Sequence, residues 1–358
     1  MPMPIPIPGL SWLFRWWSCR STPSSIGDPS PSGSSIARNF THEIAIYMPI
    51  HHKVVLFGRW YVIPVGVDAD GMFIGEERTI KPFWEGEHSW YSTFGALGST
   101  IYRFGPDDDV FKLDPMTDER WIRAPSMNTR RSLPHKLALG SKLYVLGSDP
   151  RSNGCYAEVF DPVTNKWVVL PDPPYQMSYF IISAALENPN RILVASQTPE
   201  SLAPGCSYDN KFAVFFVYDV GHGYWKMLEP ARRKIHRNCP IGWGGMARAA
   251  GSFLYWITED LDLLCYDLDL DMWLLGELNG IVLPHGDPFV PVFVHLENHR
   301  FCILQCLLYE ENNYYIQCKI VDVTRIPEEK RLGVSVVWSH QFKTDDPTTI
   351  RECCLLGK

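Results

Sequence analysis

The sequence repeats one short pattern four times, an aspartate followed six or seven residues later by a tryptophan, each time at the end of an apolar run. Successive tryptophans of the pattern lie 46, 58 and 48 residues apart. This spacing indicates a repeated four-stranded unit rather than a helical hairpin. What repeats is core and turn chemistry with no reactive group in it. The four pairs are Asp114 with Trp121, Asp161 with Trp167, Asp219 with Trp225, and Asp267 with Trp273.

The clearest unit covers residues 138–174. Its continuous apolar run, residues 143–146, ends at Gly147, which is typical of a strand buried on both faces. Asp161 and the proline after it predict a turn, with Asn165 placed for an Asx-type or left-handed position. Trp167 then begins an outer strand. We expect its indole to lie against the neighbouring unit, where truncation to alanine would cost about 3 to 5 kcal/mol.

At these residues the chain resembles the kelch-repeat β-propellers, and among them the divergent repeats of plant F-box/kelch proteins. The resemblance is carried by the apolar strand that ends in glycine, by the Tyr/Phe-Asp-x-x-Thr/Asn turn and by the tryptophan of the fourth strand. It is strong from about residue 92 to 278. The glycine doublet of kelch repeats is eroded, because Gly147 is followed by Ser148 and Gly105 by Pro106.

The predicted fold is all-β, a kelch-type β-propeller of about six four-stranded blades, with five or seven as alternatives. Weaker units at the two ends would place Trp84 in the first blade and Trp338 in the last. A closed ring usually needs one blade built from both chain ends, because an unpaired edge invites association with other chains. Residues 44–47 or 352–356 could supply the closing strand, and the sequence does not choose between them.

Two regions of different composition divide the chain. We predict a disordered Ser/Pro-rich leader over residues 1–42 and the propeller over residues 43–358. The leader begins MPMPIPIP, in which alternate residues lack an amide donor. It holds one acidic residue, Asp28, against three arginines, a composition that organelle transit peptides share. The predicted location is the cytoplasm or nucleus, with plastid or mitochondrion as the alternative if the leader is a transit peptide.

Composition argues against several classes of protein. The net charge of −7 disfavours binding to nucleic acid or to an anionic membrane, which needs a basic excess. No run of eighteen apolar residues exists that could span a membrane. The ten cysteines include no C-x-x-C pair, and most lie in apolar runs as small buried side chains. We therefore predict a monomer with no cofactor, no metal and no catalytic residue.

Basic residues gather in two segments that follow outer strands. In a propeller such turns share one face, so both segments are expected to border the central opening. In kelch adaptors that resemble this chain, residues of these turns help to bind a partner protein. We therefore predict that they bind an acidic or phosphorylated segment through arginine contacts. The residues are Arg130 and Arg131 after the Trp121 strand, and Arg232, Arg233, Lys234, His236 and Arg237 after the Trp225 strand.

The predicted function is that of a non-catalytic protein–protein interaction module. The resemblance also implies an alternative, the substrate receptor of a ubiquitin ligase, although residues 1–42 do not predict packed helices and residues 43–90 read as strands, so no F-box is predicted here. A second alternative is a copper enzyme similar to galactose oxidase, which shares the propeller. Sharing a propeller does not transfer chemistry, and no segment matches that enzyme's ligand motifs.

Overall fold

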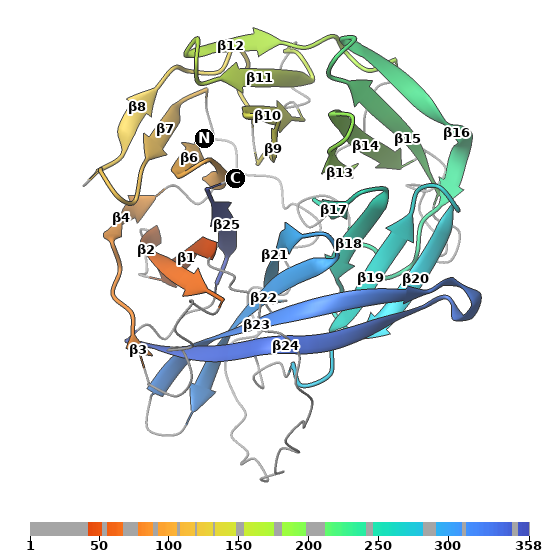
Figure 1. The fold of residues 1–358 in the computed structure, drawn as a ribbon. Helices are drawn as coiled ribbons and strands as arrows, with labels where there is room; N and C mark the ends of the chain where they lie inside the picture. The colour runs from red at the N-terminus through yellow and green to blue at the C-terminus, as the bar shows by residue number, and fades with distance from the viewer. Residues whose placement is uncertain are drawn as a thin grey trace, which may run out of the picture.

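The computed structural model describes residues 42–357 apart from 52–55, 67–77, 89–91, 106–107, 119, 132, 148–153, 175–180, 198–211, 241–245, 282–290, 310–312 and 346–349. The predicted leader therefore lies outside the described residues, except for His42, which begins the first strand. The described chain forms a ring of four-stranded antiparallel sheets around a central axis (Figure 1). The predicted all-β propeller is thus confirmed.

Five blades each follow the chain from the innermost strand outward. Blade 1 contains β5 (Thr93–Leu97), β6 (Thr100–Phe104), β7 (Val110–Leu113) and β8 (Ile122–Ala124). Blade 2 contains β9 (His135–Leu139), β10 (Lys142–Leu146), β11 (Ala157–Asp161) and β12 (Lys166–Val169). Blade 3 contains β13 (Ile181–Leu186), β14 (Arg191–Gln197), β15 (Phe212–Asp219) and β16 (Tyr224–Lys234). Blade 4 contains β17 (Arg248–Ala250), β18 (Phe253–Ile257), β19 (Asp262–Asp267) and β20 (Met272–Glu277). Blade 5 contains β21 (Val292–Glu297), β22 (Arg300–Tyr309), β23 (Asn313–Ile326) and β24 (Arg331–Thr344), with a short 3-10 turn at Pro327–Glu329.

The sixth blade joins the two ends of the described chain. Its order is β25 (Glu352–Leu356), β1 (His42–His51), β2 (Leu56–Val65) and β4 (Trp84–His88), with the C-terminal strand innermost. Both segments that the sequence proposed for closure are therefore used, since Ile44 pairs with Leu355 and Tyr47 with Glu352. The innermost strands β5, β9, β13, β17, β21 and β25 contact one another in turn around the ring. Trp84 lies in this closing blade, and Trp338 lies in β24 of blade 5.

The hydrophobic core is divided among the blade boundaries. Six clusters of buried side chains occur among the described residues, and each one joins two successive blades. On β10, Leu143 and Val145 pack toward blade 1, whereas Tyr144 and Leu146 pack toward blade 3. Alternate residues of a strand point to opposite faces, so a strand between two blades needs apolar residues at every position. This explains the continuous apolar runs of the sequence.

The repeated aspartates close the turns between the third and fourth strands of their blades. Oδ1 of Asp161 accepts hydrogen bonds from the backbone N–H of Val163 (2.9 Å) and of Thr164 (3.3 Å). Oδ1 atoms of Asp114, Asp219 and Asp267 make the same kind of Asx contact. The residue two positions before the tryptophan has a positive φ in three of these turns, with Asn165 at 54°, Gly223 at 73° and Asp271 at 49°. The predicted left-handed position of Asn165 is confirmed.

The repeated tryptophans tie each outer strand to the blade before it. Nε1 of Trp167 donates to the carbonyl oxygen of Pro125 (2.8 Å), and Nε1 of Trp225 donates to that of Pro171 (2.7 Å). Nε1 of Trp273 donates to the carbonyl oxygen of Lys234 (2.8 Å). Each acceptor lies at the end of the preceding blade's outer strand, which confirms the expected packing of the indole against the neighbouring unit.

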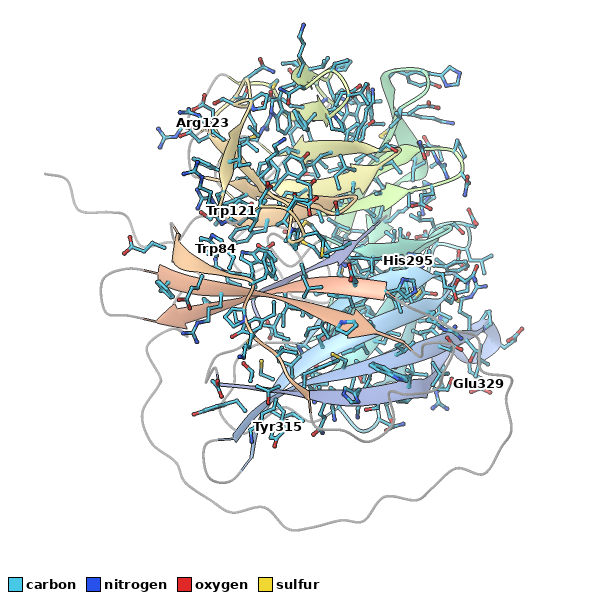
Figure 2. The ribbon with its side chains drawn as sticks, turned by 60° about the vertical axis from the view of Figure 1, so that its left-hand side comes forward. Trp84, Trp121, Arg123, His295, Tyr315 and Glu329 are labelled. Carbon is cyan, nitrogen blue, oxygen red and sulfur yellow. The ribbon has the colours of Figure 1, made fainter. Side chains whose placement is uncertain are left out.

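Trp121 occupies the corresponding position in blade 1 and packs against the closing blade. Its ring centroid lies 5.9 Å from that of Trp84 and 6.5 Å from that of Trp60, both in edge contacts. Figure 2 labels Trp84 and Trp121 close together where the two blades meet. An aromatic cluster therefore holds the closing blade to blade 1.

Replacing Trp167 with phenylalanine should separate the two contributions of the indole. The ring contacts with Phe160 and Phe104 would be largely kept, whereas the hydrogen bond to Pro125 would be lost. We expect a loss of about 1 kcal/mol in the free energy of unfolding, against about 3 to 5 kcal/mol for Trp167→Ala. Urea denaturation of both variants measures the difference. Equal losses would mean that the hydrogen bond, and not the packing, carries the contribution.

Candidate functional site

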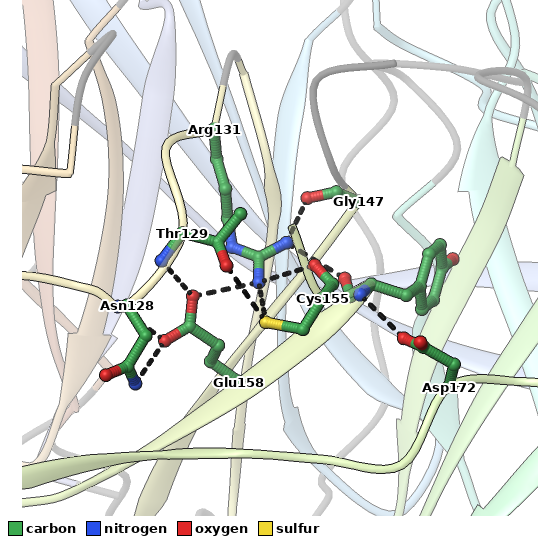
Figure 3. Close-up of polar contacts among 8 residues, drawn as sticks. Asn128, Thr129, Arg131, Gly147, Cys155, Glu158 and Asp172 are labelled. Carbon is green, nitrogen blue, oxygen red and sulfur yellow. Dashed lines mark hydrogen bonds and ion pairs between the residues drawn. The ribbon is translucent and has the colours of Figure 1, made fainter. Parts of the chain in front are cut away.

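Arg131, in the first of the two basic segments, does not lie at the surface as a docking residue would. Its side chain is fully buried (0% exposed). Its Nη1 donates to the carbonyl oxygens of Gly147 and of Tyr156, the latter at 2.9 Å (Figure 3). Its Nη2 donates to the carbonyl oxygen of Cys155 (3.1 Å) and to Oε1 of Glu158 (2.9 Å). Arg131 thus fastens the segment between blades 1 and 2 to both ends of the β10–β11 connection.

Glu158 on β11 is the buried partner of this guanidinium and is also 0% exposed. Its carboxylate accepts hydrogen bonds from the backbone N–H (2.7 Å) and Nδ2 (2.7 Å) of Asn128, and from the backbone N–H of Thr129 (3.0 Å). A buried charge is tolerated when it is paired and hydrogen-bonded in this way. The predicted docking role of Arg131 is therefore wrong, whereas its neighbour Arg130 is exposed.

The second basic segment is not a turn over most of its length. Strand β16 continues to Lys234, although the sequence analysis placed Arg232, Arg233 and Lys234 in a turn after the Trp225 strand. A register shift between Val214 and Phe216 of β15 lets the outer strand continue past Pro230. Arg232, Arg233 and Lys234 consequently lie at the outer edge of blade 3, not beside the central opening as expected.

Arg233 is a second internal clamp, 4% exposed. Its Nη1 donates to Oη of Tyr266 (3.0 Å) and to the carbonyl oxygen of Leu268 (3.1 Å), both in blade 4. Its Nη2 donates to the carbonyl oxygen of Glu229 (2.7 Å). The expected docking role of Arg233 is also wrong, because burial removes its guanidinium from the surface.

The remaining members of the segment are at least partly at the surface. Arg232 and Lys234 are exposed, and the Arg232 guanidinium lies 4.4 Å from the centre of the Phe212 ring. His236 is half-buried, with its ring centroid 5.9 Å from that of Trp273. Burial, and after it the neighbouring Arg237, lowers the pKa of His236. Arg237 itself is exposed.

Acidic groups lie close to this second segment. Oδ2 of Asp260 accepts a hydrogen bond from Nδ2 of Asn238 (3.0 Å). Burial raises the pKa of Asp262, and the nearby carboxylates of Asp260 and Glu277 raise it further. The surface around Arg237 therefore carries both signs of charge, so an anionic partner must approach it in a specific orientation.

An ion pair at the inner strands was missed by the sequence reasoning. Nζ of Lys136 on β9 lies 3.5 Å from Oε2 of Glu352 on β25, and the same oxygen accepts the backbone N–H of Phe94 on β5 (3.1 Å). Glu352 therefore links the innermost strands of blades 6, 1 and 2. No sequence signal could have revealed the pair, because its members lie 216 residues apart.

Strand direction places the blade connections on two faces. Successive strands are antiparallel, so the connections between second and third strands emerge on the same face as the segments that lead into the next blade. Arg130 and Arg237 lie in such segments. Residues 148–154 and 199–210, which connect second and third strands, lie almost wholly outside the described residues.

Other candidate chemistry is sparse in the described part of the chain. No group of three or more His, Cys, Asp or Glu side chains is placed there to hold a metal ion. Eight cysteines in the described ranges are free thiols, and Cys265, Cys302 and Cys318 are buried as predicted. Those ranges also contain no helix of the length and apolarity that crossing a membrane requires.

Replacing Arg233 with alanine tests whether it ties blade 3 to blade 4. The change would leave Tyr266 and two carbonyl oxygens without their donor, and we expect a loss of about 2 to 3 kcal/mol in the free energy of unfolding. The adjacent, exposed Arg232→Ala is the matched control, with an expected change within about 0.5 kcal/mol. Urea denaturation compares the two. A loss in Arg232→Ala as large as in Arg233→Ala would contradict the assignment.

Known proteins match this chain over part of its length. No protein-family model matches it. An F-box/kelch-repeat protein of Arabidopsis thaliana is 32% identical over 140 residues, which cover 37% of this chain and 32% of that protein. A putative F-box/kelch-repeat protein of the same plant is 38% identical over 219 residues, which cover 47% of this chain and 54% of that protein. Human Kelch-like protein 25 is 30% identical over 93 residues, which cover 24% of this chain and 16% of that protein.

The matched segments are short relative to the relatives' own lengths. The chain spans 32% and 37% of the lengths of two Arabidopsis thaliana relatives. Among solved structures, that of YjhT aligns with a TM-score of 0.40 and 13% identity, covering 68% of this chain and 96% of YjhT.

Proposed function

We propose, from the premise that the chain is a divergent kelch-repeat β-propeller, that it is a protein-docking module that performs no chemistry of its own. The docking surface would be the face on which the segments between blades emerge, with Arg130 and Arg237 as its exposed cations. Arg232 and Lys234 would extend this surface at the outer edge of blade 3. The partner would present an acidic or phosphorylated segment, to which guanidinium groups bind in a bidentate manner.

The observation that carries this proposal is that, in each of two pairs of adjacent arginines, one side chain is buried and the other is exposed. Arg131 and Arg233 are consumed by contacts within and between blades, whereas their neighbours Arg130 and Arg232 project into solvent. A buried guanidinium cannot reach another molecule, whereas an exposed one can, so the exposed arginines are the candidates for docking. The rigid ring keeps them in fixed positions, which favours recognition.

The names of the relatives support a more specific role. Two of them are described as F-box/kelch-repeat proteins. By analogy, this chain would act as a substrate receptor in a ubiquitin ligase, with the partner as the substrate. The analogy rests on segments that cover about half or less of either relative.

The rival reading as a copper enzyme makes a different prediction. Tightly bound, stoichiometric copper in the purified protein would overturn the docking proposal, and elemental analysis by mass spectrometry measures it. The proposal expects less than about one-tenth of an equivalent of any transition metal after dialysis against metal-free buffer. A structural or catalytic site would keep its metal through this step because such sites bind metals tightly.

Quantitative affinity enrichment from native extract tests the docking surface. A protein that is recovered by the wild type should be lost from the Arg130→Glu/Arg237→Glu variant. It should persist with Lys166→Glu, which reverses an exposed charge at the opposite end of a blade. Each candidate is then titrated as a purified protein by calorimetry, with an expected loss of about tenfold or more in affinity. Equal affinity for the two variants would show that the surface has been misplaced.

A further inference from the structure

The outer hairpin of blade 5 reaches beyond its own blade at both ends. Strands β23 and β24 are each 14 residues long. β24 pairs in parallel with β20 through Arg331 and Leu275, and with β3 (Arg78–Thr79) through Phe342 and Lys343. Figure 1 shows β24 as the outermost strand, running from β20 to β3. In Figure 2, Glu329 and Tyr315 mark the two ends of the hairpin.

Between these two contacts the outer edge of β24 pairs with no other strand among the described residues. Eleven residue steps separate Arg331 from Phe342. At about 3.3 Å per residue the open edge is therefore about 35 Å long. Among the described residues β20 and β3 limit it at either end, so the open edge matches one added strand of defined length.

The composition of this edge is unlike that of the other outer strands. Residues 332–342, LGVSVVWSHQF, contain no Asp, Glu, Lys, Arg or Pro. Each of the other described outer strands contains at least one charged residue. These residues include Glu85 and Glu87 on β4, Arg123 on β8, Lys166 on β12, Lys226 on β16 and Glu277 on β20. Charges and prolines normally protect an edge from unwanted pairing, and a long edge without them is suited to pairing.

The middle of the edge is also apolar and accessible. Val336 is 46% exposed and Val337 is 49% exposed. Both are exposed because the register with β23 shifts here, where Val336 faces Val321 and Trp338 faces Ile320. Two adjacent valines therefore project at the surface, between Ser335 and Trp338.

The backbone contacts at the two ends show which groups point outward. The N–H of Leu275 donates to the carbonyl oxygen of Lys330 (3.2 Å), and the N–H of Ile80 donates to that of Lys343 (2.9 Å). In a strand, the backbone groups of alternate residues point to the same edge. Counting every second residue from Lys330 and from Lys343 toward the bulge near Val337 therefore identifies the residues whose backbone groups point outward. Between the pairs with β20 and β3 they belong to Val334, Val336, Val337 and Ser339.

Basic residues at both ends of the edge decide what can occupy it. Lys343 lies at one end. Arg331, whose exposed guanidinium also forms an ion pair with Glu329 (3.7 Å), lies at the other. In an antiparallel pairing of two copies centred on Val337, each Arg331 would oppose a Lys343. Like charges directly opposite one another destabilise a strand pair. A second copy is therefore disfavoured, whereas a strand with an acidic residue near each end is complementary.

We propose that the outer edge of β24 binds an extended segment of a partner protein as an added β-strand. The segment has about eleven residues, to match the length of the open edge. It contains no proline, is apolar in the middle and carries an acidic residue at each end. Backbone hydrogen bonds provide affinity, and the flanking charges select the sequence, as in other cases of strand addition. This surface is distinct from the basic segments between blades and does not depend on their role.

Defined peptides test the proposal on the ligand side. The first probe is a fluorescein-labelled undecapeptide of alternating threonine and valine with an aspartate at each end. The second carries lysines at the ends, and the third is the first with its six central amides N-methylated. Fluorescence anisotropy with the full chain should give an affinity for the first probe about tenfold or more higher than for either of the others, as expected when paired charges and strand hydrogen bonds are lost.

Two variants test the proposal on the protein side. Ser339→Pro removes an outward N–H but no bond to β23, since proline is tolerated at an edge position whose N–H faces solvent. The affinity of this variant for the first probe should be about tenfold lower than that of Ser339→Ala. Arg331→Glu should shift the preference from the aspartate-ended to the lysine-ended peptide. Circular dichroism verifies folding, and if Ser339→Pro does not fold, Arg331→Glu and the three peptides still decide.

Three outcomes would overturn the proposal. One is equal binding of the aspartate-ended and lysine-ended peptides to the wild type, or no binding of either. Another is binding that survives N-methylation of the central amides. The third is a dimer, measured by light scattering, that Ser339→Pro dissociates, since the edge would then bind a second copy.

Discussion

Replacing Arg131 with alanine is expected to lower the free energy of unfolding by about 3 to 5 kcal/mol, the range seen when one partner of a buried ion pair is removed. The change leaves the Glu158 carboxylate buried without its countercharge. It also leaves the carbonyl oxygens of Gly147, Cys155 and Tyr156 without the guanidinium that binds them. Urea denaturation followed by tryptophan fluorescence measures the loss.

The chain contains the matched control in the preceding position. Arg130→Ala removes the same charge from an exposed side chain, and we expect a change within about 0.5 kcal/mol. A further comparison separates charge from shape: Arg131→Met combined with Glu158→Gln should be less destabilised than Arg131→Met alone, because no unpaired charge stays buried. If the Arg130 and Arg131 variants lose equal stability, the buried pair is not a structural clamp.

Removing residues 352–358 is expected to abolish cooperative unfolding and to yield insoluble protein. Strand β25 supplies five residue pairs to β1 and closes the ring from inside. Its loss would uncover the edge of β1 and the apolar side chains of Ile44 and Tyr47, which belong to the two clusters that flank the closing blade. The expected cost is comparable with the entire net stability of a domain, about 5 to 15 kcal/mol.

A shorter deletion is the control for this experiment. Removing Gly357 and Lys358 alone would delete one backbone hydrogen bond, from Gly357 to Gly98, and should cost about 1 kcal/mol. Both proteins are compared by solubility, circular dichroism and thermal unfolding. A soluble chain that ends at Arg351 and unfolds in a single transition would show that the ring does not depend on closure through β25.

The fold could be predicted from local sequence patterns because the interactions behind these patterns form within one blade or with the next one. Asp161, Asn165 and Trp167 occupy a single turn, and their side chains act on backbone groups a few residues away or on the adjacent blade. Such short-range chemistry can be read directly from spacing. The alternating burial of residues 143–146 toward two neighbours likewise explains why the run is apolar throughout.

The candidate site could be predicted only in part, because neighbouring arginines look identical in sequence. Arg131 is buried beside Glu158, 27 residues further along, and beside three carbonyl oxygens that its guanidinium binds, whereas Arg130 is exposed. Arg232 and Arg233 alternate across the two faces of β16, a strand that the sequence had ended before them. Burial of a charge depends on partners brought together by the fold, and no local pattern records them.

By itself, then, the sequence determined the repeating unit, its turns and its tryptophan anchors, since each of these depends on interactions over a few residues or one blade spacing. Only the tertiary structure decided that both ends share the sixth blade, which arginines face solvent and that β24 extends from β20 of blade 4 to β3. The physical reason is that strand pairing between distant segments and the pairing of buried charges are through-space properties of the closed ring.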